Sequence, residues 1–335
     1  MSALRPELSI IVVSFNTRAM TLACLDSITA GAPYTSYETI VVDNASSDGS
    51  AEAIADHGGA TQFIPSSINL GFAAANNRAA ELARGDYILL LNPDTVVQPG
   101  AISALVDFAK RTPDARMWGG RTLFADGSLN ATNCFRRLSL WNLFCRATGL
   151  TGLFPSSPLF NSEPYGGWDR STERAVDIIT GCFLLIPAAF WKRIGGFDPA
   201  FFMYGEEGHL AYRARQLGAR PRVTPTATII HHGGASETTR ADKAVKVLKA
   251  KATLIRRHFS PPAVPLGLAL NALWPLSRMV ALQALRAVRP TLAKRAETWR
   301  EVWARRNEWL AGYDVAAASP APIAPPLAGG NRAAS

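Results

Sequence analysis

A five-residue apolar run at positions 87–91 ends abruptly in a polar turn, and this restricts the folds that are open to the chain. The segment Asp86–Val97 reads DYILLLNPDTVV, and Pro93 stops the run. Such a short, continuous run indicates a strand buried on both faces of a sheet rather than a helix. Ligands of open α/β sheets bind beyond the carboxyl ends of the strands, so Asn92 and Asp94 are candidates to hold a divalent cation. The alternative is that Asn92-Pro93-Asp94 is only a turn, in which Asp94 caps the next helix.

Strands alternate with helices through the first third of the chain. Apolar runs predict strands at 8–14, 37–43, 61–64 and 87–91, and helical spacing predicts helices at 19–30, 50–55, 72–82 and 100–111. This order predicts an α/β fold with a mostly parallel sheet flanked by helices.

Polar clusters follow each of the four expected strands. Any one of them could be ordinary turn or cap chemistry. Four of them on successive parallel strands would line one edge of the sheet and form a binding site there. The clusters are Ser14-Phe15-Asn16, Asp43-Asn44-Ala45-Ser46, Asn69-Leu70-Gly71-Phe72 and Asn92-Pro93-Asp94.

Several functional classes are disfavoured. The turn after the first strand, at 14–17, contains no glycine, and the sequence holds no P-loop pattern, which argues against dinucleotide-dependent oxidoreductases and P-loop nucleotidases. The four cysteines form no CxxC pair and suit reduced thiols in a cytosolic protein better than disulfides or a zinc site. We expect no signal peptide, since the first apolar run is short.

The positive charge is concentrated near the C-terminus. Residues 240–310 hold 15 Lys and Arg against 4 Asp and Glu, a net of +11, while the remaining 264 residues carry −2. Residues 240–259 predict a basic amphipathic helix of the kind found at membrane surfaces. The uncharged, proline-containing segment 259–277 is not expected to form a straight transmembrane helix. The cations expected to meet anionic lipid are Lys243, Lys246, Lys249, Arg256 and Arg257.

This distribution predicts three parts: a domain at 1–239, a basic helical extension at 240–314 that associates with the membrane surface, and a disordered tail at 315–335. A nucleic-acid partner is disfavoured because the sequence holds no recognised nucleic-acid-binding module.

Taken together, the motifs resemble those of glycosyltransferase family 2, inverting enzymes of the GT-A fold, and within that family they are most similar to bacterial rhamnosyltransferases. The resemblance covers about residues 8–234. It is carried by VSFN (13–16), VVDNASSDGS (41–50), NLGFAAANNRA (69–79), LLNPD (90–94), TGCFLLIP (180–187), GGFDPAFFMYGEE (195–207) and IIHHGGAS (229–236).

The resemblance implies a role for each motif residue. Asp94 would ligate Mg²⁺ or Mn²⁺ on the donor's diphosphate, with His231 as a second metal or diphosphate contact, although His231 could also be a structural strand-end histidine. A metal ion there would neutralise the charge that develops on the leaving group. The nucleotide-sugar pocket would be formed by Ser14, Asn16, Asp43, Asn44, Asn69, Gly71, Asn76, Asn92 and Gly181.

The acidic pair Glu206-Glu207 is the candidate catalytic base. An inverting displacement needs a carboxylate to deprotonate the acceptor hydroxyl, and repulsion between adjacent acids could raise the pKa of one of them. The alternative is a solvated helix N-terminus, where acids are favoured in any case. The sequence departs from the family pattern at Glu207 and His209, where Asp is usual, and at Asn92, the first position of the acidic motif.

The implied function is transfer of a sugar, L-rhamnose from dTDP-L-rhamnose, onto a lipid-linked saccharide at the cytoplasmic face of the cell membrane, in cell-surface polysaccharide synthesis. Two alternatives stay open. The donor could be a UDP-sugar such as a UDP-hexose or UDP-galactofuranose, or the protein could be a non-catalytic nucleotide-sugar-binding assembly subunit.

Overall fold

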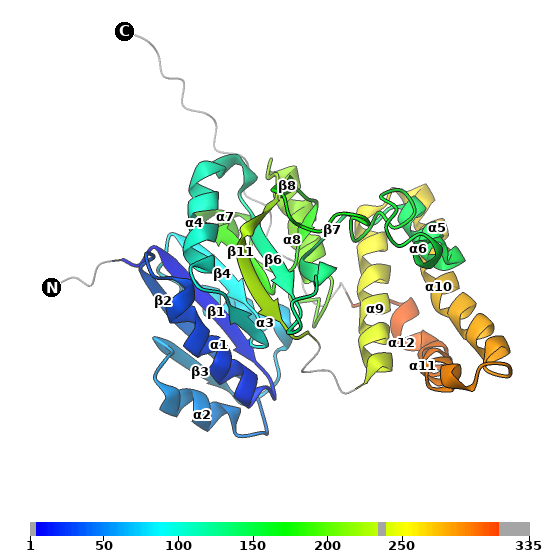
Figure 1. Cartoon of the computed structure of the whole chain (residues 1–335), viewed down its shortest axis with the longest axis horizontal. Helices are drawn as coiled ribbons and strands as arrows, with labels where there is room; N and C mark the ends of the chain where they lie inside the picture. Colours follow the sequence, from blue (N-terminus) through cyan, green and yellow to red (C-terminus); the bar gives the residue numbers. More distant parts are fainter. Residues whose placement is uncertain (1–4, 234–238, 315–335) are drawn as a thin grey trace, which may run out of the picture.

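The computed structural model describes residues 5–233 and 239–314. Its centre is a nine-stranded sheet with the order β3-β2-β1-β4-β10-β6-β11-β5, and β8 pairs with β11 (Figure 1). The last three residues of the IIHHGGAS motif and the tail at 315–335 lie outside the described residues.

The first half of the sheet is parallel, as the alternating pattern predicted. It consists of β1 (Leu8–Ser14), β2 (Tyr37–Asn44), β3 (Gln62–Ser66) and β4 (Tyr87–Leu91). The second half contains both parallel and antiparallel strand pairs. A hydrophobic run predicts where a strand lies in the sequence, but it does not predict the direction of that strand in the sheet. There β10 (Phe183–Pro187) lies antiparallel between β4 and β6 (Trp118–Leu123). The remaining strands are β11 (Arg222–His231), β5 (Thr95–Val97) and β8 (Arg174–Ala175).

Strand β4 is buried on both faces, as its continuous apolar sequence predicted. Ile88 and Leu90 face a core formed with α3 (Gly71–Ala80), α7 (Ala188–Ile194) and α8 (Glu206–Gln216). Leu89 and Leu91 face the opposite core, formed with α1 (Arg18–Gly31), α2 (Ser50–His57) and α4 (Ala101–Arg111). The sheet is therefore covered by helices on both sides, which is the three-layer arrangement expected for an α/β fold. All four cysteines are buried free thiols.

A second layer of helices stands beside the sheet domain (Figure 1). Helix α9 (Arg240–His258) lies between the sheet domain and α10 (Val264–Leu285), and α11 (Ala293–Ala304) and α12 (Arg306–Leu310) pack back onto it. Residues 125–168, rich in Gly, Pro, Ser, Asn and aromatic residues, predict a long and partly irregular segment, and they contain two helices, α5 (Leu140–Thr148) and α6 (Leu150–Leu153). Because α5 packs against α10, this segment joins the helices of the extension. A short pair of strands, β7 (Cys134–Phe135) and β9 (Ile178–Ile179), lies at its base.

The helix expected at 240–259 is present as α9, and three of its five predicted lipid-facing cations contact other groups of the protein. The guanidinium of Arg257 forms an ion pair with the fully buried Asp198. The ammonium of Lys249 lies over the ring of Tyr313, and Arg256 donates to the carbonyl of Leu310. Among the described residues, no helix has both the length and the apolar character that a membrane span requires.

Candidate active site

A cavity of about 550 Å³ opens at the carboxyl edge of the parallel strands and reaches across to α9. It collects side chains from the polar clusters after β1, β2, β3 and β4, from the start of α8 and from the end of β11. The predicted site residues that line it are Asn44, Asn69, Asn92, Asp94, Glu206, Glu207 and His231. The expectation that the clusters meet along one edge is therefore met in the geometry.

Asp94 and His231 meet at one end of this cavity. Antiparallel pairing of β5 with β11 sets His231 opposite Thr95, and the imidazole Nε2 lies 3.3 Å from Oδ1 of Asp94. The same Nε2 lies 3.4 Å from Nδ2 of Asn92, whose buried Oδ1 has no hydrogen-bond partner within the described residues. A carboxylate beside an unpartnered amide oxygen is a donor set that suits Mg²⁺ or Mn²⁺.

The electrostatics keep Asp94 ionised. Burial opposes ionisation, but the hydrogen bond and charge of His231 outweigh it and hold the pKa of Asp94 below its ordinary value. Burial would lower the pKa of His231, whereas its neighbours Cys182 and Asp94 raise it to about 10. In the described part of the chain no three His, Cys, Asp or Glu side chains gather as a metal-ligand group. A cation here would therefore rely on one carboxylate and on oxygens of a bound ligand, as Mg²⁺ often does with phosphates.

The clusters after β2 and β3 are tied together. Nδ2 of Asn44 donates to Oδ1 of Asn69 at 3.0 Å, and Oδ1 of Asn44 accepts from the backbone of Leu70 at 2.8 Å. The Oδ2 atom of Asp43 accepts from the backbone of Ser46, while its buried Oδ1 has no hydrogen-bond partner within the described residues. Asn16, in the left-handed region at φ 52°, accepts from the backbone of Ser47. These contacts hold Asn16, Asp43, Asn44 and Asn69 in place. We refer to these four residues as the donor shelf.

The predicted residues Ser14, Gly71, Asn76 and Gly181 do not line the cavity. The buried Ser14 hydroxyl is 3.0 Å from that of Thr21, and Asn76 donates to the carbonyl of Phe72. Gly71 has φ 78°, and a Cβ there would lie 2.5 Å from the carbonyl oxygen of Phe202. A Cβ on Gly181 would lie 2.8 Å from the ring of Phe72. Both glycines thus permit a close approach that a side chain would prevent.

The acidic pair at the start of α8 forms another wall of the cavity. Glu206 is only 2% exposed and its Oε2 has no partner within the described residues, whereas Oε1 of Glu207 accepts from the backbone of Gly181 at 3.2 Å. Burial and the adjacent charge of Glu207 raise the pKa of Glu206 well above its ordinary value. Burial also raises the pKa of Glu207, although hydrogen bonds from its own backbone, Gly181 and Glu206 offset part of that effect. Both acids thus have a raised pKa, and Glu206 is the more deeply buried of the two.

Comparisons with known proteins agree with this geometry. Residues 9–163 match the profile of Glycosyl transferase family 2. The chain is similar to the N-acetylglucosaminyl-diphospho-decaprenol L-rhamnosyltransferase of Mycobacterium tuberculosis, with 29% identity over 269 residues that cover 76% of this chain and 84% of the relative. It is also similar to the rhamnosyltransferase WbbL of Escherichia coli, with 24% identity over 67% of this chain and 82% of the relative. The chain therefore resembles the glycosyltransferases of family 2, most directly over residues 9–163.

The fold is that of GT-A glycosyltransferases, as the motifs implied. A solved mannosyltransferase from Pyrobaculum calidifontis, in complex with GDP-Man and Mn²⁺, superposes with a TM-score of 0.56 at 16% identity. The superposition covers 92% of this chain and 88% of that one.

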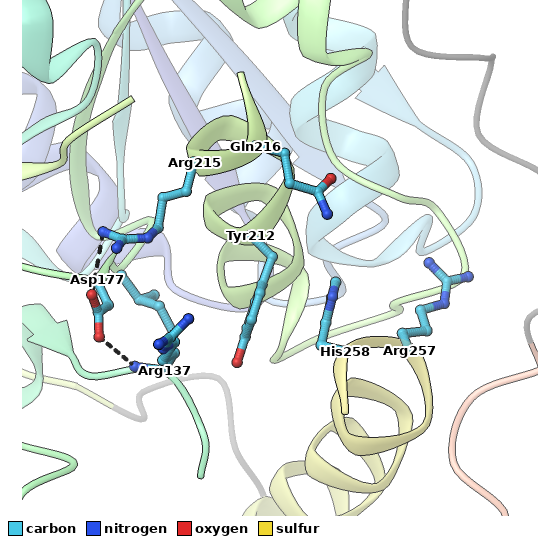
Figure 2. Close-up of a pocket in the computed structure, with 8 residues that line it drawn as sticks. Arg137, Asp177, Tyr212, Arg215, Gln216, Arg257 and His258 are labelled. Carbon is cyan, nitrogen blue, oxygen red and sulfur yellow. Dashed lines mark hydrogen bonds and ion pairs between the residues drawn. The ribbon is translucent and has the colours of Figure 1, made fainter. Parts of the chain in front are cut away.

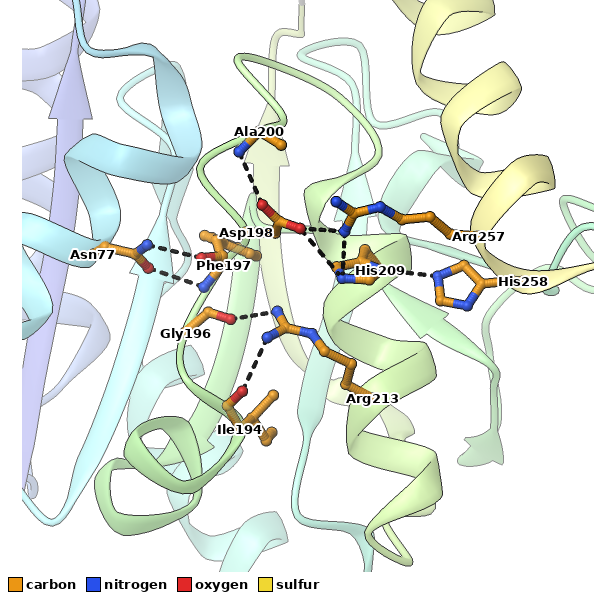
Figure 3. A network of polar contacts seen from close by, with 10 residues as sticks. All are labelled: Asn77, Ile194, Gly196, Phe197, Asp198, Ala200, His209, Arg213, Arg257 and His258. Atoms are coloured by element: carbon orange, nitrogen blue, oxygen red, sulfur yellow. Dashed lines mark hydrogen bonds and ion pairs between the residues drawn. The ribbon is translucent and has the colours of Figure 1, made fainter. Parts of the chain in front are cut away.

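His209, one of the departures from the family pattern, lies outside the cavity lining. Figure 3 shows its ring between Asp198, Arg257 and His258. Its Nδ1 is 2.8 Å from Nε2 of His258, and burial followed by Arg213 lowers the pKa of His209 to about 2. The histidine is therefore neutral, and it joins α8 to α9 in the interior of the protein.

A second cavity, of about 450 Å³, lies where α8 meets the end of α9 (Figure 2). His258 stacks on Tyr212 there with ring centroids 3.9 Å apart, and Asp177 is paired with Arg215. None of the predicted site residues lines it.

One wall of the main cavity is formed by residues that the sequence did not mark as site residues. Arg146 and Glu163, from the segment around α5, and Lys251, from α9, line the cavity as a buried ion-pair group. Lys243 also lines it, although the sequence suggested a lipid contact for this residue. No local pattern marks these residues, because they meet only through the packing of α5, α9 and α10.

Proposed function

We propose that this glycosyltransferase moves L-rhamnose from dTDP-L-rhamnose onto a saccharide linked through a diphosphate to a membrane lipid. The observation that carries the proposal is that one continuous cavity joins the Asp94–His231 end to the acidic pair of α8. The similarity to two enzymes named as rhamnosyltransferases supports the sugar. The diphospho-decaprenol acceptor in the name of the mycobacterial relative supports the lipid.

The donor would lie along the shelf beside Asp94. Asn16, Asp43 and Asn44 would hold the nucleoside, and Asn69 and Asn92 would face the diphosphate. A bound Mg²⁺ or Mn²⁺ would neutralise the charge on the leaving diphosphate. Asp94 would hold that ion, since its carboxylate is ionised and the oxygen of Asn92 beside it has no hydrogen-bond partner within the described residues.

Glu207 would take the proton from the acceptor hydroxyl as that oxygen attacks the anomeric carbon from the face opposite the diphosphate. Its carboxylate lines the cavity and is held by the backbone N–H of Gly181. Glu206 would act on Glu207 as a protonated neighbour, because it is the more deeply buried of the two acids.

Membrane attachment would involve α5 and α6 rather than the cations of α9. Trp141, Phe144, Phe154 and Phe160 form a connected aromatic cluster with centroid separations of 5.0–6.1 Å. Trp141, Phe144 and Phe154 are each more than 40% exposed. Aromatic side chains are favoured at the membrane–water interface. The side chain of Arg278 donates to the carbonyl of Arg146, near the end of α5. Further positive charges follow in the sequence at Arg286, Arg289, Lys294 and Arg295, and such charges would attract anionic lipid.

A vesicle flotation assay tests this attachment. Trp141→Ser with Phe144→Ser should release the protein from vesicles that contain phosphatidylglycerol, whereas Lys246→Glu, on α9, should leave it bound. Flotation of the aromatic double variant equal to that of the unmodified chain would contradict the proposed surface.

Calorimetry with a panel of nucleotide sugars tests the donor. dTDP-L-rhamnose with Mg²⁺ or Mn²⁺ should bind more tightly than UDP-glucose or UDP-galactofuranose. Tighter binding of a UDP-sugar would show that the donor is that UDP-sugar, while the proposed transferase activity would still stand. Binding without release of nucleoside diphosphate in the presence of any lipid-linked saccharide would favour a non-catalytic subunit.

A further inference from the structure

One stripe of α9 faces the main cavity. Lys243, Val247, Ala250, Lys251 and Leu254 all line it, and their spacing of three, four and seven residues places them on one side of a helix. The stripe lies across the cavity from the strand-end clusters. Its apolar members are Val247, Ala250 and Leu254, and its two ammonium groups belong to Lys243 and Lys251.

The cation at the inner position is only partly neutralised. Nζ of Lys251 lies 2.7 Å from Oε1 of Glu163, and Nη2 of Arg146 lies 2.7 Å from Oε2 of the same carboxylate. Arg146 and Lys251 also both lie over the ring of Trp274, at 4.8 and 5.8 Å from its centroid. Two cations thus share one carboxylate, with Lys251 and Glu163 buried and the side chain of Arg146 25% exposed. Burial lowers the pKa of Lys251 to about 8, so at pH 7 its ammonium form prevails and the group carries a net positive charge. An uncompensated buried charge is costly, so a second anion would stabilise it.

The outer position adds a cation at the rim. Nζ of Lys243 lies 6.0 Å from the ring centroid of Tyr204, which also lines the cavity. Among the described residues, no ion pair joins Lys243 to a carboxylate. Arg136, whose backbone N–H donates to the carbonyl of Glu163, lies on the same side of the cavity.

We infer that this wall, formed by Lys243, Lys251 and Arg146 with the apolar stripe of α9 between them, binds the diphosphate and the first part of the hydrocarbon chain of the acceptor lipid. The inference rests on the proposed lipid-linked acceptor. The cations suit a diphosphate, and Val247, Ala250 and Leu254 suit the hydrocarbon next to it. The saccharide would then extend from the diphosphate towards Glu207, between this wall and the donor shelf.

Binding of farnesyl diphosphate to the full chain, measured by calorimetry, tests the site. Farnesol, which lacks the phosphates, is the ligand control. Farnesyl diphosphate should bind at least 10-fold more tightly than farnesol. Lys243→Glu should weaken it about 30-fold, or about 2 kcal/mol at 1.4 kcal/mol per tenfold change. Lys251→Met should weaken it by a similar factor, since it leaves Glu163 and Arg146 as a neutral pair.

Lys246→Glu is the matched control, because Lys246 is on the same helix but does not line the cavity, and it should change the affinity less than threefold. Equal weakening by Lys243→Glu and Lys246→Glu would overturn the inference, as would equal affinity for farnesyl diphosphate and farnesol. If Lys243→Glu weakens dTDP binding as much as farnesyl diphosphate binding, these cations serve the donor and the inference is also wrong. If the site binds farnesyl diphosphate as described but no rhamnose is transferred, only the proposed function fails.

Discussion

Substituting each member of the acidic pair separately distinguishes the base from its neighbour. Glu207→Gln keeps the side-chain length and an oxygen that can accept from Gly181, so the cavity wall should stay in place. The substitution removes the basic carboxylate. General-base catalysis contributes about 10²–10⁴-fold, so kcat should fall by that factor, equivalent to about 2.7–5.4 kcal/mol of barrier. Donor affinity should stay unchanged, because Glu207 is placed against the acceptor.

Glu206→Gln should be mild, because it replaces a protonated carboxyl group with a neutral amide of the same shape in a buried position. Glu207→Asp is a second control: it retains basicity and restores the residue usual in the family, so it should keep far more activity than Glu207→Gln. The assay is release of nucleoside diphosphate in the presence of donor and acceptor, with donor affinity measured separately by calorimetry. If Glu206→Gln is inactive and Glu207→Gln is active, the two roles are exchanged and the assignment is wrong.

Substitutions at Asp94, Glu206 and Asp198 test the metal site, the buried acid and the interior ion pair. Asp94→Asn should abolish metal-dependent donor binding while the thermal melting curve stays cooperative; calorimetry with and without a chelator checks this, and undiminished metal-dependent binding would contradict it. Glu206 has a raised pKa in the fold, so its stabilising effect is complete below about 4.5, the ordinary value, and is lost as pH rises through the folded value. The melting temperature of Glu206→Gln should therefore rise relative to the unmodified chain as pH increases from 5 to 9, and a constant difference would refute this. Asp198→Asn should lower the free energy of unfolding by about 3–5 kcal/mol, because it leaves Arg257 in the interior without its carboxylate; urea denaturation measures this, and a loss below about 1 kcal/mol would contradict it.

The parallel half of the sheet and the edge of the donor shelf could be predicted from local sequence. The run at 87–91 is apolar at every position, and Ile88, Leu89, Leu90 and Leu91 are each at most 2% exposed. Polar residues directly after such strands must lie at one edge of a parallel sheet. Asn44, Asn69, Asn92 and Asp94 therefore line one cavity, although they are up to 50 positions apart in the chain.

The other wall of the cavity could not be predicted in this way. Helical spacing correctly predicted α9, but charge alone does not tell which of its sides meets protein and which meets solvent. Arg257 is neutralised by Asp198, a contact between residues 59 positions apart, and Lys251 is paired with Glu163 over 88 positions. Such pairs depend on the tertiary packing of α5, α8 and α9, for which no local periodicity exists.

The most direct test of the central claim is analysis of the product formed from dTDP-L-rhamnose, Mg²⁺ and an N-acetylglucosaminyl diphospholipid. We expect a lipid-linked disaccharide in which the rhamnose has the anomeric configuration opposite to that in the donor, and no such product from Asp94→Asn or Glu207→Gln. A product with retained configuration, or the same yield from Glu207→Gln as from the unmodified enzyme, would contradict a single displacement assisted by Glu207.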